Sequence, residues 1–327
     1  MRYVASAAGV LCVGVLCTFP SVVQAQAYPA KPIRVLVGFA AGGPTDVVVR
    51  AVAADVSARL GQTLVVENRP GAAGMIAIDA LRDLPADGYA IGPLTSPTVV
   101  ASILAGKAAN PVTAFTSIGY LWEGGIAVTA NPSTPLMAQV RSMSDLVSVA
   151  KANPGKIHFS SAGTGSTGHL FGAMLASNTA IDLPHVGYKG LAPAIIDLMA
   201  GRIAFIVGSA TNDQQLVQEG KLRILAMTGA TRSERYPSVP SIAEAGFPDL
   251  VTTTWAGMVG PGGIPKAVAD RLSSELKTTM EKTEIRRLTN TVAAEPRAGT
   301  AEEFAGRYTR DYLNFSRIIQ AANIKVE

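Results

Sequence analysis

The chain has 327 residues, and its 28 Lys and Arg against 24 Asp and Glu give a net charge of only +4, too weak to argue for nucleic-acid binding. Hydrophobic residues make up 48% and charged residues 16% of the chain, which excludes a disordered protein and a coiled coil. The length predicts about two domains with enough residues for a sizeable core.

The N-terminal segment, residues 1–25, is predicted to be a signal peptide that is removed. Arg2 gives it a positive start, and an apolar run follows from Val4 to Phe19. This run is shorter than the roughly 20 residues that a membrane anchor needs. Small residues then allow cleavage after Ala25 or Ala27. We therefore expect an exported protein of a bacterial periplasm.

The two cysteines, Cys12 and Cys17, both lie in this segment. Leu16 directly precedes Cys17, whereas a lipoprotein site needs a small residue there, so we expect no lipid attachment. Cleavage would leave the mature chain without cysteine, and therefore without structural disulfides or thiol catalysis.

Strands and helices alternate from residue 31 onward, as the hydrophobic periodicity indicates. Ser144 is expected to cap the helix that begins at residue 145. The alternation predicts an α/β fold with mainly parallel sheets flanked by helices. The expected strands are 31–39, 63–66, 89–93, 126–130, 156–161, 182–187, 203–207, 222–228 and 252–259, and the expected helices are 47–60, 75–84, 145–153, 169–177, 192–199, 213–219, 266–282 and 300–322.

The pattern restarts after Gly124 and Gly125, which predicts two lobes. The last two helices are expected to pack on the first lobe, so the first domain is discontinuous. We expect domain 1 to comprise residues 28–125 and 252–327, domain 2 to comprise 126–251, and a ligand cleft to lie between them. Trp122 and Trp255 fall on the two connections, where they either pack at the hinge or flank a ligand.

A glycine-rich segment with the pattern Gly163-x-Gly165-x-x-Gly168 joins a predicted strand to a helix. It matches the dinucleotide fingerprint, but the acidic residue that should end the next strand is missing, since Asp182 stands at that strand's start. An anion site fits better, because small residues at a helix start expose main-chain N–H groups. Hydroxyls add further donors, from Ser160, Ser161, Thr164, Ser166 and Thr167. An ordinary helix cap, Ser166 or Thr167, with glycines for close packing remains the alternative.

The first lobe has a similar turn at residues 40–46, where Gly42 and Gly43 free the backbone and Pro44 suits a first helical turn. Asp46 can accept from the amides of that turn, so we interpret it as a helix-start carboxylate. An acid in this position disfavours direct contact with an anion. The turn is therefore expected to act through main-chain groups and ordered water.

Catalytic and metal-binding patterns are weak in this sequence. The three histidines, His158, His169 and His185, have no cysteine or clustered carboxylate beside them, so no metal or cofactor is expected. Ser161 and Ser166 do not stand in a Gly-x-Ser-x-Gly elbow. An exported hydrolase that uses His169 is kept as the alternative to a binding protein.

Several segments between Tyr28 and Lys325 together resemble one family. They are Tyr28-Pro29-Ala30-Lys31-Pro32-Ile33-Arg34, Phe39-Ala40-Ala41-Gly42-Gly43-Pro44-Thr45-Asp46, Val66-Glu67-Asn68-Arg69-Pro70-Gly71, Ser160-Ser161-Ala162-Gly163-Thr164-Gly165-Ser166 with His169, and Tyr188-Lys189-Gly190. In this combination the chain resembles the Bug-type periplasmic solute receptors, the substrate-binding family of tripartite tricarboxylate transporters.

The resemblance implies a two-lobe clamshell of the periplasmic binding protein type, which closes on a small carboxylate and delivers it to a membrane permease. It also implies that the second-lobe loop holds one carboxylate and that the first-lobe loop acts through two ordered waters. A monomer is expected, and a sensor accessory is the alternative role. The implied ligand-binding residues are Phe39, Ala41, Gly43, Thr45, Asp46, Thr95, Ser96, Ser160, Ser161, Thr164, Gly165, Ser166, Thr167, His169, Tyr188 and Lys189.

Overall fold

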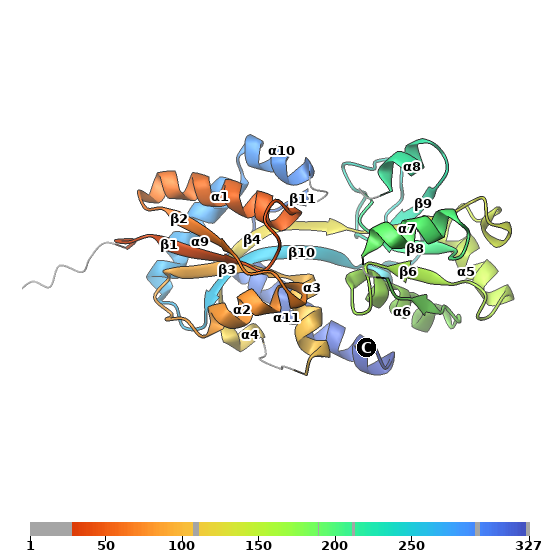
Figure 1. The fold of residues 1–327 in the computed structure, drawn as a ribbon, viewed down its shortest axis with the longest axis horizontal. Helices are drawn as coiled ribbons and strands as arrows, with labels where there is room; N and C mark the ends of the chain where they lie inside the picture. The colour runs from red at the N-terminus through yellow and green to blue at the C-terminus, as the bar shows by residue number, and fades with distance from the viewer. Residues whose placement is uncertain (1–27, 107–110, 189, 211–212, 292–294, 325–327) are drawn as a thin grey trace, which may run out of the picture.

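Two β-sheets, each covered by helices, organise the chain in the computed structural model (Figure 1). The structure describes residues 28–106, 111–188, 190–210, 213–291 and 295–324. The predicted signal peptide and Lys189 lie outside the described residues. Within these ranges, none of the helices combines the length and the apolar character that crossing a bilayer requires.

The first lobe contains a six-stranded sheet built from both ends of the chain. Its strands are β1 (Ile33–Val37), β2 (Leu64–Asn68), β3 (Ala90–Thr95), β4 (Phe115–Gly125), β10 (Thr253–Pro261) and β11 (Glu295–Pro296). Their order is β11-β4-β10-β3-β1-β2. Its helical elements are α1 (Pro44–Leu60), η1 (Ala72–Gly74), α2 (Met75–Arg82), α3 (Ser96–Leu104), α4 (Pro111–Ala114), α9 (Lys266–Met280), α10 (Thr283–Thr291) and α11 (Ala301–Ala321).

The second lobe contains a five-stranded sheet from the middle of the chain. Its strands are β5 (Ala127–Ala130), β6 (Phe159–Ser161), β7 (His185–Val186), β8 (Phe205–Gly208) and β9 (Arg223–Met227). Their order is β7-β6-β8-β5-β9. Its helical elements are η2 (Pro135–Met137), α5 (Met143–Ala152), α6 (Thr167–Thr179), α7 (Leu191–Met199), α8 (Gln214–Gln218) and η3 (Pro248–Leu250).

The α/β prediction is confirmed, with one difference in strand direction. β1 pairs in parallel with β2 and β3, and β6 pairs in parallel with β7 and β8. β10 is antiparallel to β3 and β4, and β5 is antiparallel to β8 and β9, so each sheet is mixed rather than mainly parallel. The reason is the double crossing between the sheets: the chain leaves the first sheet through β4 and returns through β10, in opposite directions.

Alternate residues of β1 bury the two faces of the first sheet. Val35 and Val37 join a core with residues of α1, α9 and α10, whereas Leu36 joins a core with residues of α2, α3 and α11. Figure 1 shows α1 and α2 on opposite sides of this sheet. The loop that follows β1 therefore starts from a strand that is fixed on both faces.

The cap of α5 differs from the prediction, which placed it at Ser144. Ser142 is the N-cap: its hydroxyl accepts from the Asp145 amide at 3.1 Å, and the Asp145 carboxylate accepts from the Ser142 amide at 3.0 Å. This reciprocal capping box satisfies two amides at once. Ser144 could not form one, because Val147 stands three positions after it.

The sequence also missed α3, most of β4, and α10. α3 is apolar over most of its length, so it shows no alternation of polar and apolar residues that would indicate a helix. α10 is polar over most of its length and buries only Ile285 and Thr289. α3 is packed by its neighbours in the fold, whereas α10 contacts the first-lobe core through Ile285.

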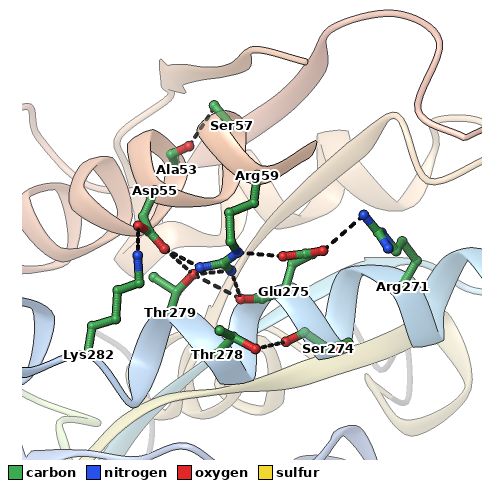
Figure 2. Close-up of polar contacts among 10 residues, drawn as sticks. All are labelled: Ala53, Asp55, Ser57, Arg59, Arg271, Ser274, Glu275, Thr278, Thr279 and Lys282. Atoms are coloured by element: carbon green, nitrogen blue, oxygen red, sulfur yellow. Dashed lines mark hydrogen bonds and ion pairs between the residues drawn. The ribbon is translucent and has the colours of Figure 1, made fainter. Parts of the chain in front are cut away.

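A cluster of ion pairs fastens α1 to α9 (Figure 2). Arg59 of α1 pairs with Asp55 at 2.5 Å and with Glu275 of α9 at 2.6 Å. Lys282 reaches Asp55 at 2.5 Å, and the Thr279 hydroxyl donates to Asp55 at 2.9 Å. Because α1 and α9 come from opposite ends of the chain, this cluster joins the two parts of the first lobe.

Both tryptophans pack at the strands that connect the lobes. Trp255 of β10 is 0% exposed, and its Nε1 donates to Asp311 of α11 at 2.5 Å. Trp122 of β4 is buried in the core that contains α1. Its neighbour Glu123 forms an ion pair with Arg307 of α11. Both tryptophans are therefore packed within the first lobe, where the chain passes between the two sheets.

Candidate ligand-binding site

A buried carboxylate holds the loop between β1 and α1. Asp46 accepts from the Gly42 amide at 2.9 Å, from Asn68 Nδ2 at 2.7 Å and from Arg50 Nε at 2.9 Å. Burial alone would raise its pKa, but the hydrogen bonds from Arg50, Asn68 and Gly42 outweigh burial and hold the pKa of Asp46 below its ordinary value. Both oxygens serve protein donors, as expected of a helix-start carboxylate.

Asn68 is a residue that sequence reasoning missed. Its Nδ2 also donates to the Phe39 carbonyl at 3.1 Å, and its Oδ1 accepts from Arg50 Nη2 at 2.7 Å. In the parallel β1–β2 pair it lies in register with Val37, at the end of the strand that precedes the loop. An amide residue at the end of a neighbouring strand is the signal that could have found it. Asn68 thus ties the loop to the edge of the first sheet.

The other predicted residues of the first loop differ in exposure. Ala41 is exposed, Phe39 and Gly43 are half-buried, and Thr45 is buried. Gly43 is the N-cap of α1, and no side chain caps this helix. The loop therefore presents main-chain groups more than side-chain groups at the start of α1.

Three serine hydroxyls of the second loop bond within the second lobe. Ser160 and Ser161 are 0% exposed, and the Ser160 hydroxyl donates to the Val186 carbonyl at 2.7 Å. The Ser166 hydroxyl accepts from the His169 amide at 3.3 Å and donates to Ser161 Oγ at 2.9 Å. Ser166 is therefore the N-cap of α6, one of the two caps that the sequence allowed.

Thr167 has no such partner. Its Oγ1 is buried and makes no hydrogen bond to any part of the chain that the structure describes, and the residue is only 6% exposed. It occupies the first turn of α6, where the first amides also have no acceptor within the helix. A buried unpaired hydroxyl is costly, so this side chain has a hydrogen-bonding capacity that the described chain does not use.

Two glycines of the loop permit close packing. A Cβ on Gly165 would lie 2.2 Å from Leu104 Cδ1 of α3, which belongs to the first lobe. A Cβ on Gly168 would lie 2.1 Å from the Val207 carbonyl oxygen of β8. The glycine pattern therefore lets α6 and its loop approach a strand and the opposite lobe. Thr164, between the first two glycines, is exposed.

His169 and His185 stack beside this loop, with ring centroids 3.8 Å apart and planes 9° from parallel. His185 Nε2 lies 2.9 Å from Ser161 Oγ, and His169 Nδ1 accepts from the Gly165 amide at 3.1 Å. Burial lowers the pKa of both rings, and the charge that His169 would carry lowers the pKa of His185 further, to about 4. Both rings are therefore neutral near pH 7.

The Ser161–His185 pair has the spacing of a nucleophile and a base but not their other properties. Ser161 is 0% exposed, and His185 binds a proton too weakly to act as a base near pH 7. Burial and the charge of His169 are the causes that lower the pKa of His185. The geometry does not support a hydrolase. In the described ranges, no three His, Cys, Asp or Glu side chains gather as a metal site.

Thr95 and Ser96 lie at the end of β3, which pairs with the connecting strand β10. Thr95 is the N-cap of α3, and its Oγ1 accepts from the Thr98 amide at 3.3 Å. Ser96 Oγ accepts from the Trp255 amide at 3.3 Å. Both residues are buried, and both hydroxyls have partners within the first lobe.

Tyr188 follows β7 and is half-buried. Its hydroxyl donates to Asp197 of α7, which also pairs with Arg202 at 2.6 Å. Lys189, the next predicted residue, lies outside the described residues. A Cβ on Gly163 would lie 2.9 Å from the Tyr188 carbonyl oxygen, so the segment at Tyr188 runs beside the second loop.

Two cavities lie between the lobes beside the connecting strands, on the β9 and β11 side. Their volumes are about 560 Å³ and 340 Å³. The larger one is lined by side chains that include Arg235, Tyr236 and Arg287. No predicted ligand residue lines either cavity. The larger cavity is therefore a competing location for a ligand.

Comparison with known proteins identifies the family. A model described as "Tripartite tricarboxylate transporter family receptor" matches residues 48–324 of this chain. The chain belongs to this receptor family. The Bug-type resemblance of the sequence is thereby confirmed. The receptor is also 28% identical to protein BugT of Bordetella pertussis, over 312 residues that make up 93% of each chain.

Solved structures share the fold of the receptor. A TctC solute binding protein from Polaromonas is 26% identical, with a TM-score of 0.80, over 90% of this chain and 99% of that one. A protein of R. palustris whose structure was determined with adipate is 28% identical, with a TM-score of 0.71, over 91% of this chain and 99% of that one. The receptor is thus a two-lobe solute-binding protein by family and by fold.

Proposed function

We propose that this receptor captures a small carboxylate in the periplasm, a dicarboxylate, tricarboxylate or aromatic carboxylate, and delivers it to the permease of a tripartite tricarboxylate transporter. Membership of the receptor family supports a transport role. The adipate in the structure of the R. palustris protein supports a carboxylate ligand. The receptor is proposed to act as a monomer, without metal or cofactor, after removal of its signal peptide.

The observation that carries the proposal is the start of α6. Thr167 supplies a buried hydroxyl without a partner in the described chain, next to first-turn amides that no helical carbonyl can satisfy. The positive end of the helix dipole points to the same place. A carboxylate there accepts from the hydroxyl and the amides together, and it meets no acidic side chain of the second loop.

The first lobe contributes the other side of the site in this proposal. The contacts among Asp46, Asn68 and Arg50 hold the β1–α1 loop in one conformation. Because Asp46 is negatively charged, a second carboxylate is better accommodated through ordered water than by direct contact. Phe39, Ala41 and Gly43 would carry that water on their main-chain groups.

Closure of the lobes would remove water from the ligand. We propose residues 28–125 with 252–327 as one lobe and 126–251 as the other, with hinges where β4 meets β5 and where β10 begins. Three or four hydrogen bonds to a charged group contribute roughly 1.5–3 kcal/mol each. A micromolar dissociation constant corresponds to a binding free energy of about −8.2 kcal/mol, so these hydrogen bonds would supply a large share of it.

Thermal unfolding of the mature receptor tests this function. We expect one or more of adipate, malate, citrate and benzoate to raise the melting temperature, because a ligand at 100 times its dissociation constant stabilises the folded state by about 2.7 kcal/mol. The matched amides and alcohols, which lack the charge, should leave it unchanged. If no carboxylate shifts the melting temperature, or if the neutral analogues shift it equally, the proposal is wrong.

A further inference from the structure

We propose that His185 is a positioning residue of the carboxylate loop. It accepts a hydrogen bond from the Ser161 hydroxyl and thereby fixes the orientation of the Ser166 side chain, the N-cap of α6. The inference rests on the proposed function of that loop. His185 lies on β7 in register with Phe159 of β6, and its Nε2 lies 2.9 Å from Ser161 Oγ of the loop. The rings of Phe159 and His169 lie beside it, with centroids at 4.9 Å and 3.8 Å.

The hydrogen bonds around Ser161 restrict where its proton can go. Ser166 Oγ accepts from the His169 amide, so its own proton is free to point at Ser161 Oγ, 2.9 Å away. The Gly163 amide donates to the same oxygen at 3.3 Å. A hydroxyl oxygen has two lone pairs, and these two donors fill both of them. Ser161 must therefore act as a donor to its remaining neighbours.

Two acceptors are within reach of that proton. His185 Nε2 lies at 2.9 Å and the Gly163 carbonyl oxygen at 3.1 Å. Suppose instead that the Ser161 proton pointed at the Gly163 carbonyl. Ser161 Oγ could then neither donate to His185 Nε2 nor accept from it, because its proton and both lone pairs would be in use. The arrangement that satisfies both groups has Ser161 donating to Nε2, with the proton of the neutral His185 ring on Nδ1.

A chain of hydrogen bonds thus links His185, Ser161 and Ser166. It ends at the amide of His169 in the first turn of α6. Without the acceptor on His185, the Ser161 proton turns to the Gly163 carbonyl, 3.1 Å away, and this rotation turns the Ser161 lone pairs, so the hydrogen bond from Ser166 is weakened. The helix start then loses its fixed geometry at the place where Thr167 and the first amides are proposed to meet the carboxylate. Donors that are not ordered in advance bind more weakly, because ligand binding must order them.

Nitrogen NMR of the imidazole rings tests the proton placement without any ligand. The chain has three histidines, so few signals need assignment. At pH 7 we expect His185 to carry its proton on Nδ1, and Ser161→Ala to shift the ring toward a mixture of tautomers. A wild-type ring protonated on Nε2, or a tautomer that Ser161→Ala leaves unchanged, would overturn the inference.

Calorimetry with adipate as the probe tests the effect on binding. We expect His185→Phe, which keeps an aromatic ring but no acceptor, to weaken binding at least tenfold. His185→Gln, whose side-chain oxygen can accept from Ser161, should bind within about threefold of the wild type. The matched control is His158→Phe, since the side chain of His158 makes no contact with the loop hydroxyls described above, and it should bind as the wild type does.

The binding and tautomer measurements together decide the role of His185. Equal binding by His185→Phe and the wild type, or equally weak binding by His185→Gln and His185→Phe, would overturn the inference. If His185→Phe does not fold, His185→Gln and the tautomer measurement on Ser161→Ala decide. If the wild type binds neither adipate nor the other carboxylates, the proposed function fails, while the tautomer measurement still confirms or overturns the role of His185.

Discussion

Replacing Thr167 with valine is expected to weaken carboxylate binding roughly ten- to a hundredfold without lowering the stability of the fold. The loss of binding follows because a hydrogen bond to a charged group contributes about 1.5–3 kcal/mol. Stability is spared because the Thr167 hydroxyl is buried and has no partner in the described chain, so a methyl group of the same shape removes an unsatisfied group. Weaker binding without lower stability is a combination that a general loss of structure would not produce.

Calorimetry and urea unfolding of Thr167→Val measure both effects. Ser117→Ala is the matched control, because Ser117 Oγ in β4 is also buried and has no partner among the residues that the structure describes, but lies away from both loops. It should match the wild type in binding and be no less stable. A Thr167→Val receptor that binds as tightly as the wild type would show that this hydroxyl does not meet the ligand.

Gly168→Ala is expected to destabilise the fold by about 3 kcal/mol, near the upper end for an overpacked site. The added Cβ would lie 2.1 Å from the Val207 carbonyl oxygen and 2.9 Å from its carbonyl carbon. Both atoms belong to the main chain of β8, in the middle of a hydrogen-bonded sheet, so they cannot turn aside as a flexible side chain would. α6 must move away from the sheet instead, and the loop before it moves too.

The free energy of unfolding in urea measures this effect. Gly306→Ala is the matched control, since Gly306 lies inside α11 and a Cβ there would meet only the flexible end of Arg310, at 3.4 Å. Alanine should stabilise that helix by about 0.5–1 kcal/mol. Two variants of equal stability would mean that the approach of α6 to β8 is looser than the structure describes.

The turns of this receptor could be predicted from the sequence because glycine and proline act locally. Pro44 at the first position of α1 and the glycines before α6 mark helix starts whatever the rest of the chain does. The helix-start role of Asp46 was predictable for the same reason, since its partner Gly42 stands four residues away.

The partners of the side chains in the loops could not be predicted. Ser161 meets His185 across 24 residues and Asp46 meets Asn68 across 22, and both contacts depend on which strands become neighbours in the sheets. No pattern in the sequence favours His185 over His169 as the histidine that contacts the serines. It also showed five hydroxyls without showing that Thr167 alone is both buried and unpaired among them.

The hinge shows a third limit of the sequence. Trp122 and Trp255 fall on the connecting strands in both the prediction and the structure, but their surroundings depend on α11, which follows some 45 residues later in the chain than Trp255. Contacts of α11 with Glu123 and Trp255 fix these residues on the connecting strands. The expectation that the C-terminal helix packs on the first lobe made this arrangement plausible without fixing any contact.

Amide NMR during a titration with adipate tests most directly whether the first turn of α6 binds the carboxylate. The account predicts the largest shift changes at the amides of Thr167 and Gly168, toward lower field as they begin to donate to a charged oxygen. Largest changes at Arg235 and Arg287 around the 560 Å³ cavity, with the start of α6 unaffected, would contradict it.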